Sequence, residues 1–168
     1  MLRQPRQSVL IDTSFLITLF DNSRPNHEVA KKYYKHFIDN SIDMYLSAIV
    51  ASEYEYKDSI DPILDTGNFI PLPFNLDDSK LAGSFASRLH SESRGKHTSR
   101  DSAKDDVKLL AQCSNHSIDF VATDDTSTMA KYCRRLNTMD ESRTKLITLD
   151  CFDVSDFNGG QTELDINF

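Results

Sequence analysis

Residues 8–17 read Ser-Val-Leu-Ile-Asp-Thr-Ser-Phe-Leu-Ile, an apolar run that ends in an acid and leads through a polar turn into a second apolar run. This order predicts a buried strand, a turn and the start of a helix. Ligands of open parallel sheets bind at the carboxyl ends of the strands. Asp12, which ends the predicted strand, is therefore a candidate site residue, although a role as N-cap of the following helix explains the same acid equally well.

The same order of strand and helix recurs along the chain. Apolar runs predict further strands at 42–46, around Phe69, at 118–123 and at 146–149. Helical spacing occupies the intervals at 27–38, 76–90 and 104–113, and two more helices are predicted after Ser47, a plausible N-cap, and after Asp125. This alternation predicts an α/β fold in which helices flank a central, mainly parallel sheet.

Size and charge limit the classes of function. The 168 residues, 39% of them hydrophobic, suit one domain, which we place at 1–155 with a tail at 156–168. Asp and Glu number 26 against 19 Lys and Arg, so any nucleic-acid site must be local. The three scattered cysteines favour a reducing cytoplasm, and the first apolar run is too short for a signal peptide or a membrane span.

Two further acids share a predicted helical face with apolar side chains: Glu53 with Ile49 and Tyr56, and Asp106 with Leu110 and Cys113. Both carboxylates are therefore expected to point inward. A buried carboxylate needs a cation or a network of hydrogen bonds. For either acid taken alone, a buried salt bridge to Lys or Arg is the alternative explanation.

The fourth acid, Asp125, repeats the placement of Asp12, since it follows a predicted strand that ends at Thr123. Two carboxylates ~4 Å apart repel by roughly 4 kcal/mol at the effective dielectric of protein sites, and a divalent cation would remove that repulsion. Oxygen ligands without a histidine or cysteine set favour Mg²⁺ or Mn²⁺. We predict a catalytic set of Asp12, Glu53, Asp106 and Asp125, with Asp12, Asp106 and Asp125 as metal ligands.

Each acid belongs to a longer block of sequence: VLIDTSFLI at 9–17, LSAIVASE at 46–53, DVKLLAQC at 106–113 and FVATDD at 120–125. In this order the blocks resemble those of the PIN-domain nucleases, particularly the VapC-type toxins. The neighbouring acids Asp105 and Asp124 leave a shift of one residue open in the third and fourth blocks. The phase of the apolar residues favours Asp106, and the Thr-x-Asp spacing favours Asp125.

The resemblance implies a three-layer PIN-like fold and hydrolysis of RNA by metal-activated water, which leaves a 5′-phosphate and a 3′-hydroxyl. Thr13 and Ser14 would hold a ligand or the phosphate, and Thr123 would orient Asp125, with Asp105 and Asp124 in support. Thr13 and Ser14 could equally do no more than start the helix. The resemblance also implies a protein antitoxin and a homodimer, whereas the cellular role could be toxicity, RNA maturation or turnover.

An acidic site repels RNA, so other residues must hold the phosphate backbone. The segment 88–104 carries a net charge of plus 3, from five basic residues and two acids, and leads directly to Asp106. We expect its basic side chains to follow the phosphates. The candidates are Arg94, Lys96, Arg100 and Lys104. A merely solvated loop is the alternative.

Three other functions compete with this hypothesis. A haloacid-dehalogenase-type phosphatase needs a second Asp two residues after the first, where this chain has Ser14. A receiver domain would place its paired acids early in the chain, whereas Asp124 and Asp125 come late. The third alternative is a PIN-like module that binds RNA or a protein without cutting, and the presence of all four acids speaks against it.

Overall fold

The computed structural model describes residues 6–91 and 102–157 and places their strands in one parallel sheet. The strand order is β3-β2-β1-β4-β5. The strands are β1 (Ser8–Ile11), β2 (Asp43–Ser47), β3 (Phe69–Leu72), β4 (Phe120–Thr123) and β5 (Lys145–Thr148). The short strand expected around Phe69 is therefore present as β3, at one edge of the sheet.

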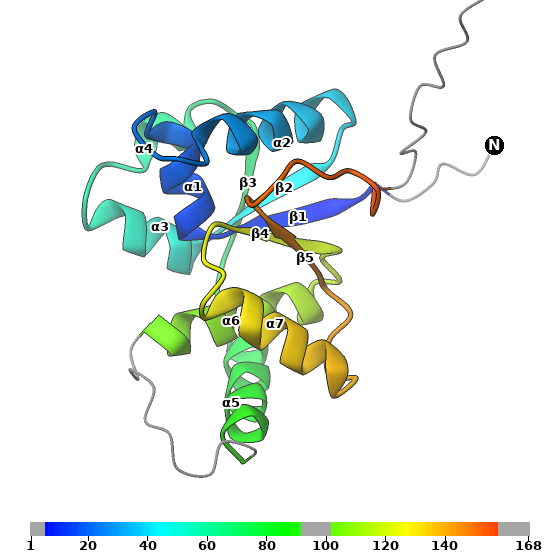
Figure 1. Ribbon diagram of the computed structural model, residues 1–168. Coiled ribbons are helices and arrows are strands. Elements are labelled where there is room, and N and C mark those ends of the chain that lie inside the picture. Colours follow the sequence, from blue (N-terminus) through cyan, green and yellow to red (C-terminus); the bar gives the residue numbers. More distant parts are fainter. Residues whose placement is uncertain (1–5, 92–101, 158–168) are drawn as a thin grey trace, which may run out of the picture.

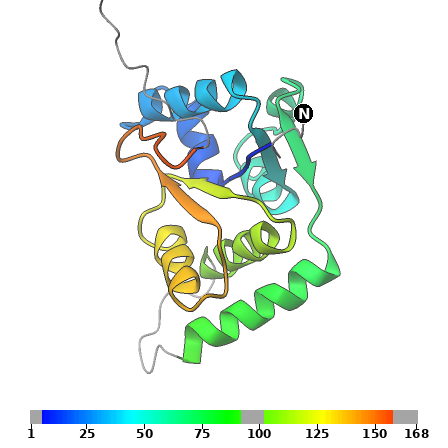
Figure 2. The ribbon, with the colours of Figure 1, turned by 90° about the vertical axis from the view of Figure 1, so that its right-hand side faces the viewer.

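Helices cover both faces of this sheet (Figures 1 and 2). One side carries α1 (Thr13–Phe20), α2 (His27–Asp39), α3 (Ala48–Glu55) and α4 (Asp61–Leu64). The other side carries α5 (Leu76–Ser91), α6 (Ser102–Asn115) and α7 (Met129–Thr138). The predicted three-layer α/β fold is thus confirmed. In the described part of the chain, no helix is long and apolar enough to cross a membrane.

The middle strand of the sheet fixes where a site can form. Leu10 of β1 pairs with Tyr45 of β2 on one side and with Val121 of β4 on the other, and all residues of β1 are buried. From β1 the chain steps outward to β2 and β3, and then returns across the sheet to β4. The switch point of the topology therefore lies between β1 and β4, and in sheets of this kind ligands bind outside the carboxyl ends of the strands at that point.

The segment up to Phe157 packs against the domain, beyond the boundary expected at residue 155. Phe157 is only 5% exposed and stacks on Phe120 at a centroid distance of 4.5 Å. The Tyr33 hydroxyl lies 3.0 Å from the Cys151 carbonyl, to which it donates, and accepts from the backbone N–H of Asp153. Packing thus continues two residues past the boundary expected at 155, because a large aromatic side chain stands there. The remainder of the expected tail, from residue 158, lies outside the described residues.

Three local features complete the description of the fold. Residues 61–64 form the short α4 in spite of Pro62, since proline is tolerated in the first turn of a helix. Ser47 caps α3 as expected, by accepting from the N–H of Ile49. Cys113, Cys133 and Cys151 are free thiols.

Candidate active site

Asp12 lies at the switch point of the sheet and performs two tasks. Its Oδ1 accepts from the backbone N–H of Thr13 and so caps α1, as the simpler of the two explanations expected. Its Oδ2 accepts hydroxyl hydrogen bonds from Ser14, at 2.8 Å, and from Thr123, at 2.7 Å. The side chain is almost completely buried, which raises its pKa, and Asp125 adds to that shift while the three hydrogen bonds oppose it. Capping accounts for only one of the two oxygens.

Asp125 lies at the end of β4, next to Asp12 across the switch point. Its backbone N–H donates to the Thr123 hydroxyl at 2.9 Å, so one threonine contacts both acids. The carboxylate accepts hydrogen bonds from the backbone and hydroxyl groups of Ser127 and Thr128. Burial acts to raise the pKa of Asp125, but these hydrogen bonds outweigh it and hold the pKa below its ordinary value. Asp125 therefore remains an anion held in a fixed orientation.

Asp124, the alternative to Asp125, has a different environment. Its Oδ2 accepts from Thr18 at 2.7 Å and its Oδ1 from Asn26 at 2.8 Å. Both oxygens are thus used to join β4 to α1 and to the residue before α2. Its backbone N–H donates to Ser14 at 2.9 Å. Asp124 holds the scaffold together, whereas the neighbouring Asp125 is the acid that interacts electrostatically with Asp12 and Asp106.

Glu53, near the end of α3, is half-buried and accepts a hydrogen bond from the Thr13 hydroxyl. Burial raises its pKa, and Asp105 and Asp12 contribute in the same direction. The apolar face predicted around Glu53 is wrong at one residue. Tyr56, assigned to the same buried face, is 91% exposed because α3 ends at Glu55, before the expected stripe is complete.

Asp106, in the first half of α6, has the least satisfied carboxylate of the four. Its Oδ2 is buried and has no hydrogen-bond partner among the described residues. Burial raises its pKa to about 7, and Asp12, Asp125 and Glu53 all reinforce the shift, while Thr128 opposes it. The neighbouring Asp105 instead forms an ion pair of 2.7 Å with Lys108, one turn along the helix. The Asp106 carboxylate is therefore surrounded by negative charge and would be stabilised by a bound cation.

The electrostatic interactions show that the four predicted acids share one region of the molecule. Asp106 interacts with the other three, and Asp12 with Asp125 and Glu53. Within residues 6–91 and 102–157, none of the four forms a salt bridge with Lys or Arg. In the same ranges, no three Asp, Glu, His or Cys side chains are gathered closely enough to hold a metal ion. The carboxylates thus lie in one region of the molecule without closing into a ligand cage.

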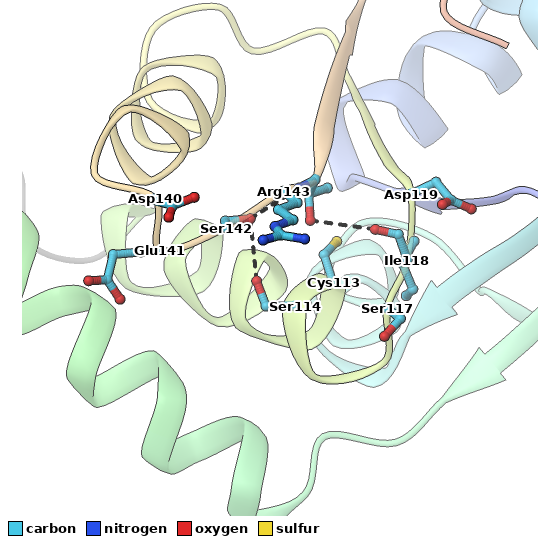
Figure 3. Close-up of a pocket in the computed structure, with 10 residues that line it drawn as sticks. Cys113, Ser114, Ser117, Ile118, Asp119, Asp140, Glu141, Ser142 and Arg143 are labelled. Carbon is cyan, nitrogen blue, oxygen red and sulfur yellow. Dashed lines mark hydrogen bonds between the residues drawn. The ribbon is translucent and has the colours of Figure 1, made fainter.

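Other features lie away from these acids. A cavity of about 360 Å³ opens near the amino-terminal ends of β4 and β5, between the end of α6 and the turn before β5. Its lining includes Ser114, Ser142 and Arg143 (Figure 3). It contains none of the predicted site residues. Of the expected RNA-binding residues, Arg94, Lys96 and Arg100 lie outside the described residues, and only the backbone of Lys104, in α6, is described.

Comparison with known proteins identifies the family. Residues 9–152, which include all four acids, match the family described as the PIN domain. The chain belongs to the PIN-domain family. The predicted resemblance is thereby confirmed. A comparison with curated proteins gave no match.

Solved structures with the same PIN-like fold come from toxin-antitoxin systems. VapBC2 from Rickettsia felis, bound to a DNA fragment from its promoter, aligns with a TM-score of 0.58 at 10% identity, covering 84% of this chain and 98% of that one. VapBC-1 from nontypeable Haemophilus influenzae gives 0.55 at 14% identity, covering 85% and 98%. VapC20 from Mycobacterium tuberculosis, a sarcin-ricin-loop-cleaving toxin, gives 0.51 at 14% identity, covering 73% and 94%. At such identities the similarity concerns the fold.

Sequence reasoning missed one part of this PIN-domain site. Ser127 and Thr128 hold both oxygens of Asp125, yet neither was singled out. The signal was present in the sequence, because Asp125-x-Ser-Thr is the order in which an aspartate accepts hydrogen bonds from residues two and three positions further on. These two residues explain why α7 begins at Met129 instead of directly after Asp125.

Proposed function

We propose that this PIN domain is a ribonuclease that hydrolyses RNA phosphodiester bonds with Mg²⁺ or Mn²⁺, and that it is the toxin of a cytoplasmic toxin-antitoxin pair. One observation carries the proposal. The Oδ2 of Asp106 is a buried acceptor that has no hydrogen-bond partner among the residues that the structure describes, and three other acids lie nearby at the switch point of the sheet. An unpartnered buried acceptor costs about 1–3 kcal/mol, so a fold that retains one needs a compensating ligand.

The residues present fit a hard divalent cation. The donors are all carboxylate oxygens, which suit Mg²⁺ and Mn²⁺, and Asp12, Asp106 and Asp125 are the proposed ligands. The cation would neutralise the carboxylates, activate water and stabilise charge on the leaving oxygen. Small movements of side chains would bring the carboxylates together, since their present separation is what mutual repulsion favours.

The surrounding side chains position these acids. Thr123 and Ser14 hold Oδ2 of Asp12, and Ser127 and Thr128 hold Asp125, so both anions are oriented before a ligand binds. Glu53, fixed by Thr13 and with a pKa that burial raises, is suited to accept a proton from water. Asp105 and Asp124 are engaged elsewhere and support the scaffold.

The proposed biological role rests on the neighbours of the fold. VapBC structures are complexes of toxin and antitoxin, and VapC20 cleaves the sarcin-ricin loop. By analogy, this chain would be inhibited by a protein antitoxin and would act as a homodimer.

Cleavage of mixed cellular RNA tests the proposal. The wild type should degrade RNA with Mn²⁺ and stop on addition of EDTA. Asp106→Asn should lose at least about 100-fold in rate, whereas the matched control Asp105→Asn, which breaks the partly exposed ion pair to Lys108, should remain active. Full activity of Asp106→Asn, or cleavage that ignores EDTA, would overturn the proposal. Binding of RNA without cleavage would favour a non-catalytic PIN module.

A further inference from the structure

Most of the cations that the structure describes are already neutralised by a nearby acid. Ion pairs occupy Arg6, Arg24, Lys31, Lys35, Lys80, Arg88, Lys108 and Lys145. Arg88, which opens the basic segment 88–104, is held by Glu141 and is therefore a poor candidate for binding phosphate. In a chain of net charge −7, neighbouring cations on one helix face that form no ion pair can attract an anionic partner.

In the described part of the chain, the helix α7 carries two exposed cations without an ion pair on one face, whereas Lys32, Lys57 and Arg143 lie singly elsewhere. Its sequence, MAKYCRRLNT, contains three basic residues and no acid. Its apolar face, which includes Tyr132, Cys133 and Leu136, is buried against the domain. Lys131 and Arg134 are exposed, three residues apart and thus on one face, and neither forms an ion pair within the described part of the chain.

The position of α7 relates these cations to the acids. The helix begins four residues after Asp125, whose carboxylate organises the turn that leads into it. It packs beside α6, which carries Asp106, on the same side of the sheet (Figure 1). From Asp125 to Arg134 is nine residues, roughly 13 Å if measured as helix. Long basic side chains at this range can hold phosphates that flank a bond bound at the acids.

We infer that Lys131 and Arg134 form a docking strip for the phosphate backbone of single-stranded RNA, which leads the strand to the four acids. The inference rests on the proposed function, since it names residues that bring the substrate to that site. Acids alone would repel RNA, so a negatively charged site needs cations at its border to bind the substrate. The strip would act without reading bases, because contacts to phosphates carry no sequence information.

The salt dependence of RNA binding separates direct contacts of Lys131 and Arg134 with phosphates from a general electrostatic attraction. Each phosphate neutralised on a single strand contributes about 0.7 to the slope of log K against log salt. We would measure the binding of a fluorescein-labelled single-stranded RNA of mixed sequence by anisotropy, in EDTA so that cleavage does not interfere. The proteins are the wild type, Lys131→Glu/Arg134→Glu and Lys131→Gln/Arg134→Gln. Lys32→Glu, at an exposed and equally unpaired lysine on α2, is the matched control.

The expected result is a slope reduced by about 1.4 in both double variants, with weaker binding in the Glu pair because it also repels phosphate. Lys32→Glu should keep the wild-type slope. A slope that is equal in the wild type and the double variants, or a loss matched by Lys32→Glu, overturns the inference and would leave an acidic protein as the partner of α7. If the wild type binds RNA but never cuts it, the proposed function fails, while the slopes still decide the role of α7. Absence of RNA binding by the wild type overturns both.

Discussion

Thr123 donates its hydroxyl proton to Oδ2 of Asp12 at 2.7 Å and thereby links the carboxyl ends of β4 and β1. The same hydroxyl accepts from the backbone N–H of Asp125 at 2.9 Å. Thr123 is completely buried, so these contacts are shielded from solvent. Two proposed metal ligands from distant parts of the sequence thus depend on one side chain for their relative position.

Replacing this threonine tests its positioning role. Thr123→Val keeps the shape of the side chain but removes both hydrogen bonds, so the affinity for Mn²⁺ should fall about 10–100-fold. Thr123→Ser retains the hydroxyl and should restore most of that affinity. The circular dichroism spectrum of each variant serves as the folding control. If Val and Ser bind Mn²⁺ equally well, the hydroxyl does not position the acids.

Neutralising Asp106 should have opposite effects on stability and on activity. Without metal, Asp106→Asn removes a buried charge beside three acids, and its amide can donate to those neighbours. We expect the free energy of unfolding in EDTA at about pH 8 to rise by about 1–3 kcal/mol. Urea denaturation measures this change, with Asp105→Asn as the control that should gain nothing. A less stable Asp106→Asn protein would mean that the carboxylate has a stabilising partner without metal.

The sequence was sufficient for the parts of this fold that local patterns determine. Buried runs followed by acids predicted β1 and β4, and the register of these strands then brings Asp12 and Asp125 together. The choice of Asp125 over Asp124 came from spacing alone, and the structure shows Asp124 bonded to Thr18 and Asn26. The roles of these acids in catalysis stay predictions.

Tertiary packing decided what the sequence could not. The exposure of Tyr56 depends on where α3 ends, and the burial of Phe157 depends on a partner, Phe120, that is distant in sequence. Helical periodicity predicts neither the exposure of Tyr56 nor the burial of Phe157. The ion pair that neutralises Arg88 likewise joins α5 to Glu141, which no local pattern relates.

The contact between Phe157 and Phe120 should contribute to stability. Phe157→Ala removes a ring that is 5% exposed and stacked on Phe120, and should lower the free energy of unfolding by about 3 kcal/mol. Phe152→Ala, at a ring that is 41% exposed, is the matched control and should cost less. Urea denaturation at neutral pH checks both. Equal losses would show that Phe157 is not part of the core.

The stability of the protein should depend on the protonation of His36. Its Nε2 is buried without a hydrogen-bond partner in the described structure, and its ring meets the edge of Phe157 at 4.8 Å. Burial lowers its pKa from 6.5, although Asp39 opposes the shift. The unfolded chain therefore binds the proton more readily than the folded protein. The stability that depends on neutral His36 is fully present above pH 6.5 and is lost as the pH falls below it.

Urea denaturation at about pH 7.5 and about pH 5.5 measures that loss. The drop in the free energy of unfolding should be smaller in His36→Gln than in the wild type. His90→Gln, at an exposed position on α5, should retain the wild-type drop. An identical drop in wild type and His36→Gln would remove this histidine as a source of the pH dependence.

Calorimetric titration of Mn²⁺ into the purified protein tests most directly whether Asp12, Asp106 and Asp125 form one cation site. The wild type should bind Mn²⁺ with measurable heat, and Asp12→Asn, Asp106→Asn and Asp125→Asn should each abolish binding or weaken it at least about tenfold. Asp124→Asn, whose carboxylate faces Thr18 and Asn26, should bind like the wild type. A wild type that releases no binding heat, or variants that all bind Mn²⁺ equally well, would contradict the account.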